Sequence, residues 1–159
     1  MLGENFWWIV WSVLLVSQIV LVILFYNWAD LVVLLYIGWI IVAIGLFIGY
    51  LGVTALKRSG RVPKGRSFVH TTVIVDKGIY SVIRHPQYLS WVFVSLGIIL
   101  LPQHWVVAIV GIAAALAVYM QARQDDHSLI DKFGDDYKRY MQKVPRMNIL
   151  AGVIRLLRR

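Results

Sequence analysis

The stretch FWWIVWSVLLVSQIVLVILFY, residues Phe6 to Tyr26, is apolar at almost every position. A helix needs about 20 predominantly apolar residues to cross the hydrocarbon core of a bilayer. Tryptophans lie near both ends of the stretch, and aromatic side chains are enriched at the two membrane interfaces. The polar interruptions are Ser12, Ser17 and Gln18. The stretch therefore predicts a membrane span and sets the class of the whole fold.

The composition of the whole chain fits the same class. Of its 159 residues, 60% are hydrophobic, and the mean hydropathy is +0.72. At roughly 20 residues for each crossing, this length accommodates one compact helical domain with about four spans. Cysteine is absent, so the chain has neither a disulfide framework nor a cysteine metal site. We predict an all-α, polytopic membrane protein.

The predicted spans belong to a single integral-membrane domain of residues 1–159. The polar turn from Asn27 to Asp30 is so short that the first two spans must form an antiparallel hairpin. The basic region after the second span contains Gly and Pro, which is typical of a surface loop. The expected spans are 6–26, 31–53, 87–101 and 104–122, with a cytosolic loop at 54–86 and a cytosolic helical segment at 123–159.

Positive charge is confined to two blocks of the sequence. The formal net charge is +8, and every Lys and Arg lies within Lys57–Arg84 or Arg123–Arg159. Cytosolic loops of membrane proteins carry an excess of Lys and Arg, and these side chains attract anionic lipid head groups. We therefore expect membrane lipids as partners, both termini in the cytosol, and no nucleic-acid partner.

The third apolar run is too short to cross a bilayer alone. Tyr88 to Leu101 comprises 14 residues, which cover roughly 21 Å of a core about 30 Å thick. Either the bilayer thins locally, or Arg84, His85 and Pro86 lie partly below the membrane surface. Polar backbone at that depth must be buried in protein or line a cavity. The length of this run thus predicts a cavity on the cytosolic side.

Two glycines of the second span form a GxxxG pattern, Gly45 with Gly49. Such a pattern lets another helix approach closely. The partner can be a helix of the same chain, or the Gly45/Gly49 face can form a homodimer. The sequence leaves both alternatives open.

Three polar clusters are expected on the cytosolic side, and ionisable residues near membrane depth indicate function. Tyrosines can stack on a ring, a carboxylate pair can bind hydroxyl or ammonium groups, and an arginine can bind an anion. Such a set suits a zwitterionic nucleoside cofactor beside a lipid-facing opening for a hydrophobic acceptor. Each side chain could instead be an interface anchor or part of a solvated helix face. The clusters are Tyr80, Arg84, His85 and Tyr88; Arg123, Asp125 and Asp126; and Tyr137, Tyr140 and Arg146.

A metal centre and a serine hydrolase are not expected. The histidines are far apart in the sequence, and one of them, His104, is predicted on the opposite side of the membrane. No nucleophile-elbow motif surrounds any serine.

Two separated motifs stand out in the C-terminal half of the chain. The first is G-x-Y-x-x-x-R-H-P-x-Y, from Gly78 to Tyr88. After one span and an acidic pair, the second is L-x-x-x-F-G-x-x-Y-x-x-Y-x-x-x-V-P-R, from Leu129 to Arg146. In this order, the two motifs resemble those of the isoprenylcysteine carboxyl methyltransferase family and its phospholipid-methyltransferase relatives, over roughly the C-terminal half of the chain.

The resemblance implies an integral-membrane enzyme that uses S-adenosyl-L-methionine and releases S-adenosyl-L-homocysteine. Its acceptor would be a lipophilic molecule in the membrane, such as an isoprenylcysteine carboxylate or another small lipid. A carboxylate acceptor needs no base, whereas an amine, hydroxyl or thiol would need one, and His85 or Asp126 is the candidate. The implied cofactor contacts are Val73, Ile74, Val75, Tyr80, His85, Pro86, Gln87, Tyr88 and Asp125.

The chain departs from the family pattern at three places. The acidic pair, usually glutamate in the family, is Asp125-Asp126 here, and Thr72 stands where a histidine often opens the segment before the first motif. The arginine that is associated with substrate in eukaryotic members of the family aligns with Gln121, and Arg123, two residues on, is the substitute that we predict.

Other functions remain open from the sequence. They are a phospholipid N-methyltransferase, an NADPH-dependent membrane sterol-type reductase, which carries a related R-H-P-x-Y element, and a non-catalytic membrane scaffold. The compact four-span form is typical of a prokaryotic chain in the plasma membrane.

Overall fold

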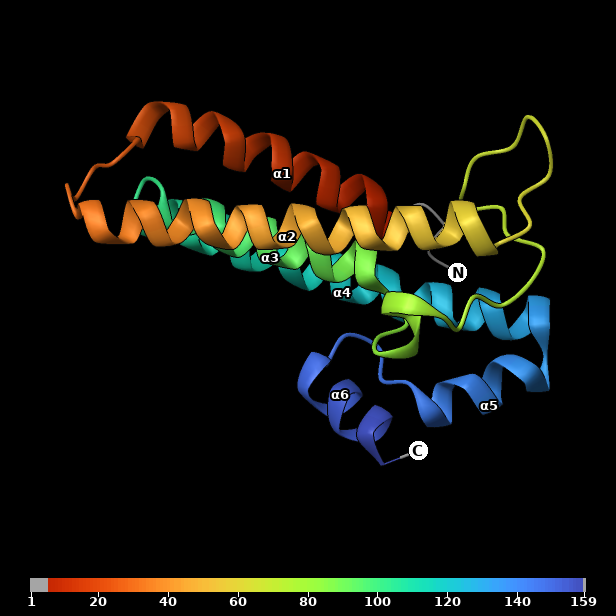
Figure 1. Ribbon diagram of the computed structural model, residues 1–159. Coiled ribbons are helices and arrows are strands. Elements are labelled where there is room, and N and C mark those ends of the chain that lie inside the picture. The colour runs from red at the N-terminus through yellow and green to blue at the C-terminus, as the bar shows by residue number, and fades with distance from the viewer. Residues whose placement is uncertain (1–5, 159) are drawn as a thin grey trace. The chain divides into compact units, whose positions relative to one another are not determined.

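The computed structural model describes residues 6–158, and these form six α-helices, one short 3-10 helix and no strand. The prediction of an all-α fold is confirmed. The expected cytosolic positions of residues 1–5 and of Arg159 fall outside the described residues. In chain order, the elements are α1 Phe6–Phe25, α2 Val32–Ser59, η1 Gly78–Ser81, α3 Pro86–Leu100, α4 Trp105–Phe133, α5 Asp135–Lys143 and α6 Ile149–Leu157 (Figure 1).

Three helices, α1, α2 and α4, are long and apolar enough to cross a membrane. The fourth expected span corresponds to α3, an apolar helix of 15 residues. It begins at Pro86, as expected from the fixed φ of proline, which suits the first helical turn. Because α3 is shorter than the three long apolar helices, its crossing of the membrane stays a prediction.

Two helices extend beyond the predicted spans. α2 continues through residues 54–59, which were expected in the loop, and α4 continues through residues 123–133. The apolar pattern ends where a helix leaves the bilayer, but the helix itself ends only at a stop signal. Gly60 follows α2 and Gly134 follows α4, and the basic last turn of α2, with Lys57 and Arg58, favours its C-terminal dipole.

The described residues divide into two compact units, one of residues 6–47 with 90–124 and the other of residues 48–89 with 125–158. α2, α3 and α4 each contribute to both units. The prediction of one domain is not tested by this division.

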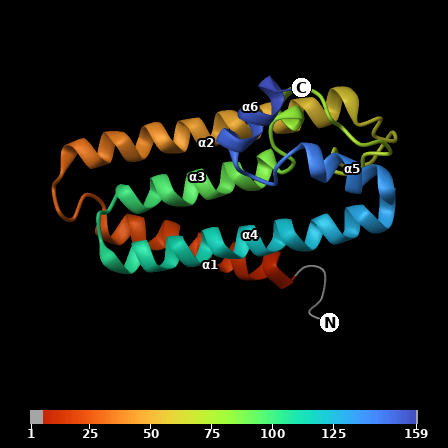
Figure 2. The same ribbon diagram turned by 90° about the horizontal axis from the view of Figure 1, so that it is seen from below.

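In the first unit, α2 and α3 approach closely through glycines, and Figure 2 shows them side by side. A Cβ atom on Gly97 would lie 2.7 Å from the carbonyl oxygen of Gly38. A Cβ atom on Gly45 would lie 2.9 Å from the Cβ of Phe93. Gly45 therefore packs against α3 of its own chain, and the homodimer through Gly45 and Gly49 stays an untested prediction.

The same unit joins α1 to α3 through a buried amide. Gln18, one of the polar interruptions of the first span, is fully buried, and its Nε2 donates to the carbonyl of Ser95 at 2.9 Å. Trp11 packs against Trp91 with ring centroids 4.9 Å apart.

In the second unit, α5 packs against the end of α4. Tyr137, Tyr140 and Val144 form a buried cluster. Gly134, with φ of 59°, makes the turn between the two helices, because glycine adopts this backbone conformation without steric cost. The partly buried residues around the cluster are Ile74, Leu129, Ile130, Phe133 and Met141.

Candidate functional site

The two sequence motifs meet through their backbones in the second unit. The N–H of Arg84 donates to the carbonyl of Pro145 at 3.0 Å, and the N–H of His85 donates to that of Arg146 at 3.1 Å. Both donors lie between η1 and α3, outside either helix. The V-P-R segment therefore holds the R-H-P segment in place.

One carboxylate, Asp126, lies at the centre of this junction and is only 2% exposed. Its Oδ1 lies 2.8 Å from His85 Nε2 and 3.3 Å from Arg84 Nη1. The hydroxyl of Tyr137 donates to the same oxygen at 2.8 Å. Its Oδ2 accepts from Arg146 Nε at 2.7 Å. His85, Tyr137 and Arg146 thus lie at hydrogen-bonding distance from Asp126, and Arg84 adds an ion pair.

Two arginines pair with Asp126 at the junction. Two guanidinium groups, those of Arg84 and Arg146, surround the single carboxylate of Asp126. Arg84 is 8% exposed, and its Nε has no hydrogen-bond partner among the described residues. Arg84 is therefore a buried partner of Asp126 and not a snorkelling surface anchor.

Two tyrosine hydroxyls of α5 support the junction. Tyr140 OH donates to the carbonyl of Tyr80 at 2.6 Å. Arg84 lies over the ring of Tyr137, 6.0 Å from its centroid. Burial raises the pKa of the Tyr80 phenol, and burial with the neighbouring Asp126 raises the pKa of Tyr137. Tyr137 therefore keeps its proton and acts as a donor to Asp126.

The first turn of α3 adds a second polar contact. Tyr88 OH donates to Asp125 Oδ2, and the rings of His85 and Tyr88 lie 5.4 Å apart. Nε2 of Gln87 is buried and has no hydrogen-bond partner among the described residues. Gly52 of α2 lets this turn approach, because a Cβ atom there would lie 3.0 Å from Pro86 Cγ.

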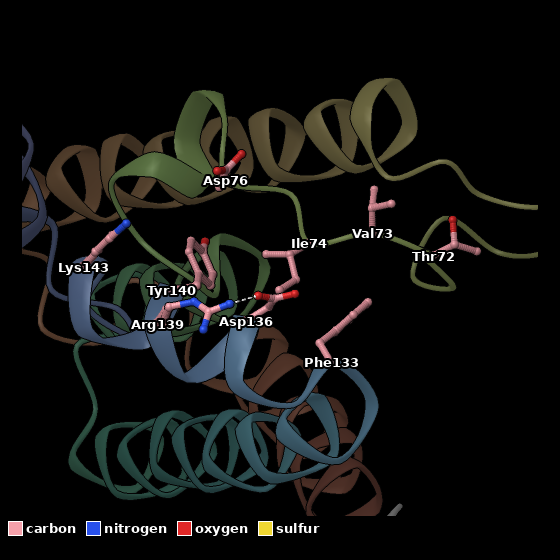
Figure 3. Close-up of a pocket in the computed structure, with 9 residues that line it drawn as sticks. All are labelled: Thr72, Val73, Ile74, Asp76, Phe133, Asp136, Arg139, Tyr140 and Lys143. Carbon is pink, nitrogen blue, oxygen red and sulfur yellow. Dashed lines mark hydrogen bonds and ion pairs between the residues drawn. The ribbon is translucent and has the colours of Figure 1, made fainter.

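A pocket of about 490 Å³ lies beside this junction in the second unit. Figure 3 shows Ile74, from the segment before η1, facing the side chains of α5. Asp136 and Arg139 form an ion pair at the pocket. The lining residues are Thr72, Val73, Ile74, Asp76, Phe133, Asp136, Arg139, Tyr140 and Lys143.

The predicted site residues thus fall into two groups. Val73 and Ile74 line the pocket, whereas Tyr80, His85, Asp125 and Asp126 belong to the hydrogen-bonded junction. Tyr140 connects them, because its ring lines the pocket and its hydroxyl bonds to Tyr80. Of the remaining predicted residues, Val75 and Pro86 are buried. Gln87 and Tyr88 lie in the first turn of α3.

Arg123 is the one predicted site residue that belongs to the first unit. It is exposed on α4 and is not among the side chains that pair with Asp126. Its predicted role as substitute for the substrate arginine stays a prediction.

Several residues of the site were absent from the predicted set. Arg84, Tyr137 and Arg146 all contact Asp126, although the sequence only placed them in polar clusters. The spacing of Tyr137, Tyr140 and Val144 on one face of a short helix was the available signal for Tyr137. Nothing local in the sequence pairs Arg84 with Asp126.

No group of three or more histidine, aspartate or glutamate side chains that could hold a metal ion occurs within residues 6–158.

Comparison with known proteins places residues 40–131 within the model of the isoprenylcysteine carboxyl methyltransferase (ICMT) family. Among curated proteins, the chain is similar to the protein-S-isoprenylcysteine O-methyltransferase of Homo sapiens, with 29% identity over 102 residues. That match covers 57% of this chain and 35% of the human protein. The protein of the same name from Schizosaccharomyces pombe is 29% identical over 99 residues, which cover 57% of this chain and 42% of the relative.

The protein of the same name from Xenopus laevis is 35% identical over 86 residues, which cover 53% of this chain and 29% of the relative. The chain therefore spans well under half the length of the curated relatives it matches. No solved structure matches it significantly.

Proposed function

Because the chain belongs to the isoprenylcysteine carboxyl methyltransferase family, we propose that it transfers the methyl group of S-adenosyl-L-methionine to a lipophilic acceptor in the membrane. The curated relatives are named for O-methylation of protein S-isoprenylcysteine. An isoprenylcysteine-like carboxylate is therefore the first acceptor in this proposal.

One observation carries the proposal, namely the meeting of the R-H-P-x-Y motif with the acidic pair and the V-P-R segment. Asp126 links His85 to Arg146, and the neighbouring Asp125 accepts from Tyr88. A scaffold protein would not need this buried polar arrangement, which costs desolvation energy unless every group is satisfied.

The donor and acceptor groups of this region fit S-adenosyl-L-methionine. The buried Nε2 of Gln87 lacks an acceptor among the described residues, which a polar ligand atom could supply. The ring of Tyr140 and the apolar side chains of Val73 and Ile74 line a pocket large enough for a nucleoside. The residues that would hold the cofactor are Val73, Ile74, Val75, Tyr80, His85, Pro86, Gln87, Tyr88 and Asp125.

The cofactor supplies a methyl group that is already activated on a sulfonium, so the protein's task is alignment in a dry site. Correct alignment of the reactants can lower the barrier by roughly 7–11 kcal/mol. Asp126 contributes by fixing His85 and Arg84 rather than by accepting a proton, because His85, Arg84, Tyr137 and Arg146 already surround its oxygens. We assign it a positioning role.

His85 is the base in this proposal when the acceptor must lose a proton. With a carboxylate at Nε2, the neutral ring carries its proton there, which leaves Nδ1 as the accepting nitrogen. A carboxylate acceptor needs no base. Arg123 is exposed on α4 and could bind an acceptor carboxylate.

The membrane arrangement is part of the same proposal. α3 joins α1, α2 and α4 as a fourth span, with the basic loop and both termini in the cytosol of a prokaryotic cell. At 15 residues, α3 covers about 22 Å of a core about 30 Å thick. The R-H-P segment at its start would then lie below the membrane surface.

Ligand binding tests the function directly. The purified protein in detergent is expected to bind S-adenosyl-L-homocysteine in calorimetry and to give no signal with NADPH. Gln87→Ala and Tyr88→Phe should each weaken that binding about tenfold, the effect of losing one hydrogen-bonding group worth about 1.4 kcal/mol. Lys64→Ala, in the exposed basic loop, is the matched control and should leave the affinity unchanged. Heat from NADPH, with none from the nucleoside, would favour the reductase instead.

The acceptor is then identified by transfer of a labelled methyl group. Prenylcysteines are expected to be methylated, and phosphatidylethanolamine is the substrate that would indicate the phospholipid N-methyltransferase alternative. Fatty acids and isoprenoid thiols complete the panel.

A further inference from the structure

Helix α6 exposes a continuous apolar stripe. Leu150 is 77% exposed, Val153 40%, Ile154 51% and Leu157 81%. Their spacing of i, i+3, i+4 and i+7 places all four on one face of the helix. No other described segment of the second unit buries this face. Leaving such a face in water is unfavourable, because burial of large apolar side chains is favourable.

The opposite face of α6 fixes the helix to the candidate site. Gly152 is buried, and a Cβ atom there would collide with the carbonyl oxygen of Val82. Val82 lies two residues before Arg84. At the start of the helix, Asn148 Oδ1 accepts from the N–H of Ala151 at 2.9 Å. The stripe therefore has a set direction relative to the R-H-P segment.

The charges of α6 suit an anionic surface. Arg155 and Arg158 are exposed, and no acidic residue lies between Ile149 and Arg158. Apolar residues with arginines on a neighbouring face are the composition of helices that lie in the head-group layer of a bilayer. Basic side chains near an anionic membrane are attracted to it.

The same unit contains another segment of this composition. On α2, the exposed Tyr50 precedes Lys57 and Arg58, both exposed, so an apolar helix surface gives way to a basic one within the unit. This sequence of residues is typical of a helix that emerges from a membrane on its cytosolic side. The second unit therefore has a membrane boundary of its own, to which α6 can bind.

We propose that α6 is a membrane-docking helix whose stripe of Leu150, Val153, Ile154 and Leu157 inserts into a bilayer containing anionic lipid. Through the contact of Gly152 with Val82, the docked helix sets the depth of Arg84 and His85 relative to the lipid. The proposal goes beyond methyl transfer and does not depend on it, since the occupant of the stripe is the lipid itself.

The absence of cysteine makes a direct test practicable. Leu150→Cys and Leu157→Cys are each labelled with an environment-sensitive fluorophore, and the full chain is reconstituted in nanodiscs of phosphatidylcholine alone or mixed with phosphatidylglycerol. Lys138→Cys, on an exposed polar position of α5, is the control. Lipids that carry a quencher on the acyl chain report contact with the bilayer.

Both α6 labels should emit as in an apolar medium and be quenched, more strongly with phosphatidylglycerol, while the Lys138→Cys label is not. Arg155→Gln combined with Arg158→Gln should remove the difference between the two bilayers. Emission typical of water in both bilayers would overturn the proposal. So would apolar emission without quenching, because a protein surface such as a second copy would then cover the stripe. Equal quenching in the two bilayers would overturn the role of anionic lipid.

Circular dichroism in detergent shows that each variant is folded, and binding of S-adenosyl-L-homocysteine is measured separately. Its outcome is independent of the fluorescence result, so failure of the docking proposal and failure of the proposed function are distinguishable.

Discussion

Asp126 organises the site because several donors converge on its two oxygens. The side chains come from segments far apart in the sequence, so this carboxylate joins the start of α3 to α5 and to the V-P-R segment. With the carboxylate gone, Arg84 would keep its charge in a buried position without compensation. The loss of one partner of a buried ion pair is therefore more costly than the net value of the pair.

We expect Asp126→Ala to lower the free energy of unfolding by about 3–5 kcal/mol. The measurement is unfolding in mixed detergent micelles, followed by tryptophan fluorescence. Asp136→Ala is the matched control, because Asp136 forms an exposed pair with Arg139, and such pairs contribute little. Equal losses in the two variants would contradict the central role of Asp126.

Among the helices, the crossing of α2 and α3 depends on small residues at the contact. A methyl group on Gly97 would lie 2.7 Å from the Gly38 carbonyl oxygen and from Val42 Cγ2. Both neighbours belong to α2, so the two helices would have to separate.

Gly97→Ala should therefore destabilise the protein by about 1–3 kcal/mol, the usual cost of overpacking. Thermal unfolding in detergent measures the change. Val33→Leu adds a similar volume at an exposed position of α2 and should have little effect. An unchanged melting temperature for Gly97→Ala would show that the crossing is looser than described.

A tyrosine of helix α5 should make the protein less stable at high pH. The pKa of Tyr137 is raised in the folded protein, so its phenol ionises more readily once the chain unfolds. The contribution of Tyr137 to the free energy of unfolding is present below the ordinary tyrosine pKa of about 10, and it is lost as pH rises above that value.

The free energy of unfolding should fall above about pH 10, and Tyr137→Phe should make this fall shallower, with the raised pKa of Tyr80 accounting for the rest. Denaturation at several pH values gives the slope. Tyr36→Phe, at an exposed position of α2, should leave the slope as it is. If Tyr137→Phe and Tyr36→Phe give the same slope, α5 is not the source of the fall in stability.

For the whole molecule, the proposed topology puts the basic loop and the turn between α1 and α2 on opposite sides of the membrane. Single cysteines at Lys64 and Ala29, both exposed, report this in a chain without cysteine. On intact bacterial cells, a membrane-impermeant maleimide should label Ala29→Cys, whereas Lys64→Cys should react only after the cells are opened. The reverse pattern would invert the topology.

The helical class and the positions of the apolar runs could be predicted because both depend on local composition. The continuation of α2 to Ser59 was missed, since a helix that leaves the bilayer loses its apolar pattern before it ends. Helical structure after residue 122 was expected, and it forms the end of α4 and helix α5. The terminating glycines, Gly60 and Gly134, were visible in the sequence and mark the ends more closely than hydropathy does.

The motif residues His85, Tyr88, Asp125 and Asp126 were named from the sequence, and they lie together in the structure. Their arrangement could not be predicted, because the role of Arg84 depends on Asp126, which lies on a different helix. The sequence around Arg84 is compatible both with an exposed anchor at the membrane interface and with a buried ion-pair partner. Only the fold decides between the two.

The bond between Tyr140 and the Tyr80 carbonyl closes a stretch of 60 residues, and Pro145 and Arg146 close one of similar length. Such long-range contacts form slowly, because the entropy of the intervening chain must be lost before any contact is gained. α3 and α4 lie within this stretch, so their insertion and pairing should precede closure. We expect a folding intermediate whose helices are already in the membrane while its ligand site is still open. During refolding, the recovery of nucleoside binding should therefore lag behind the recovery of helix content.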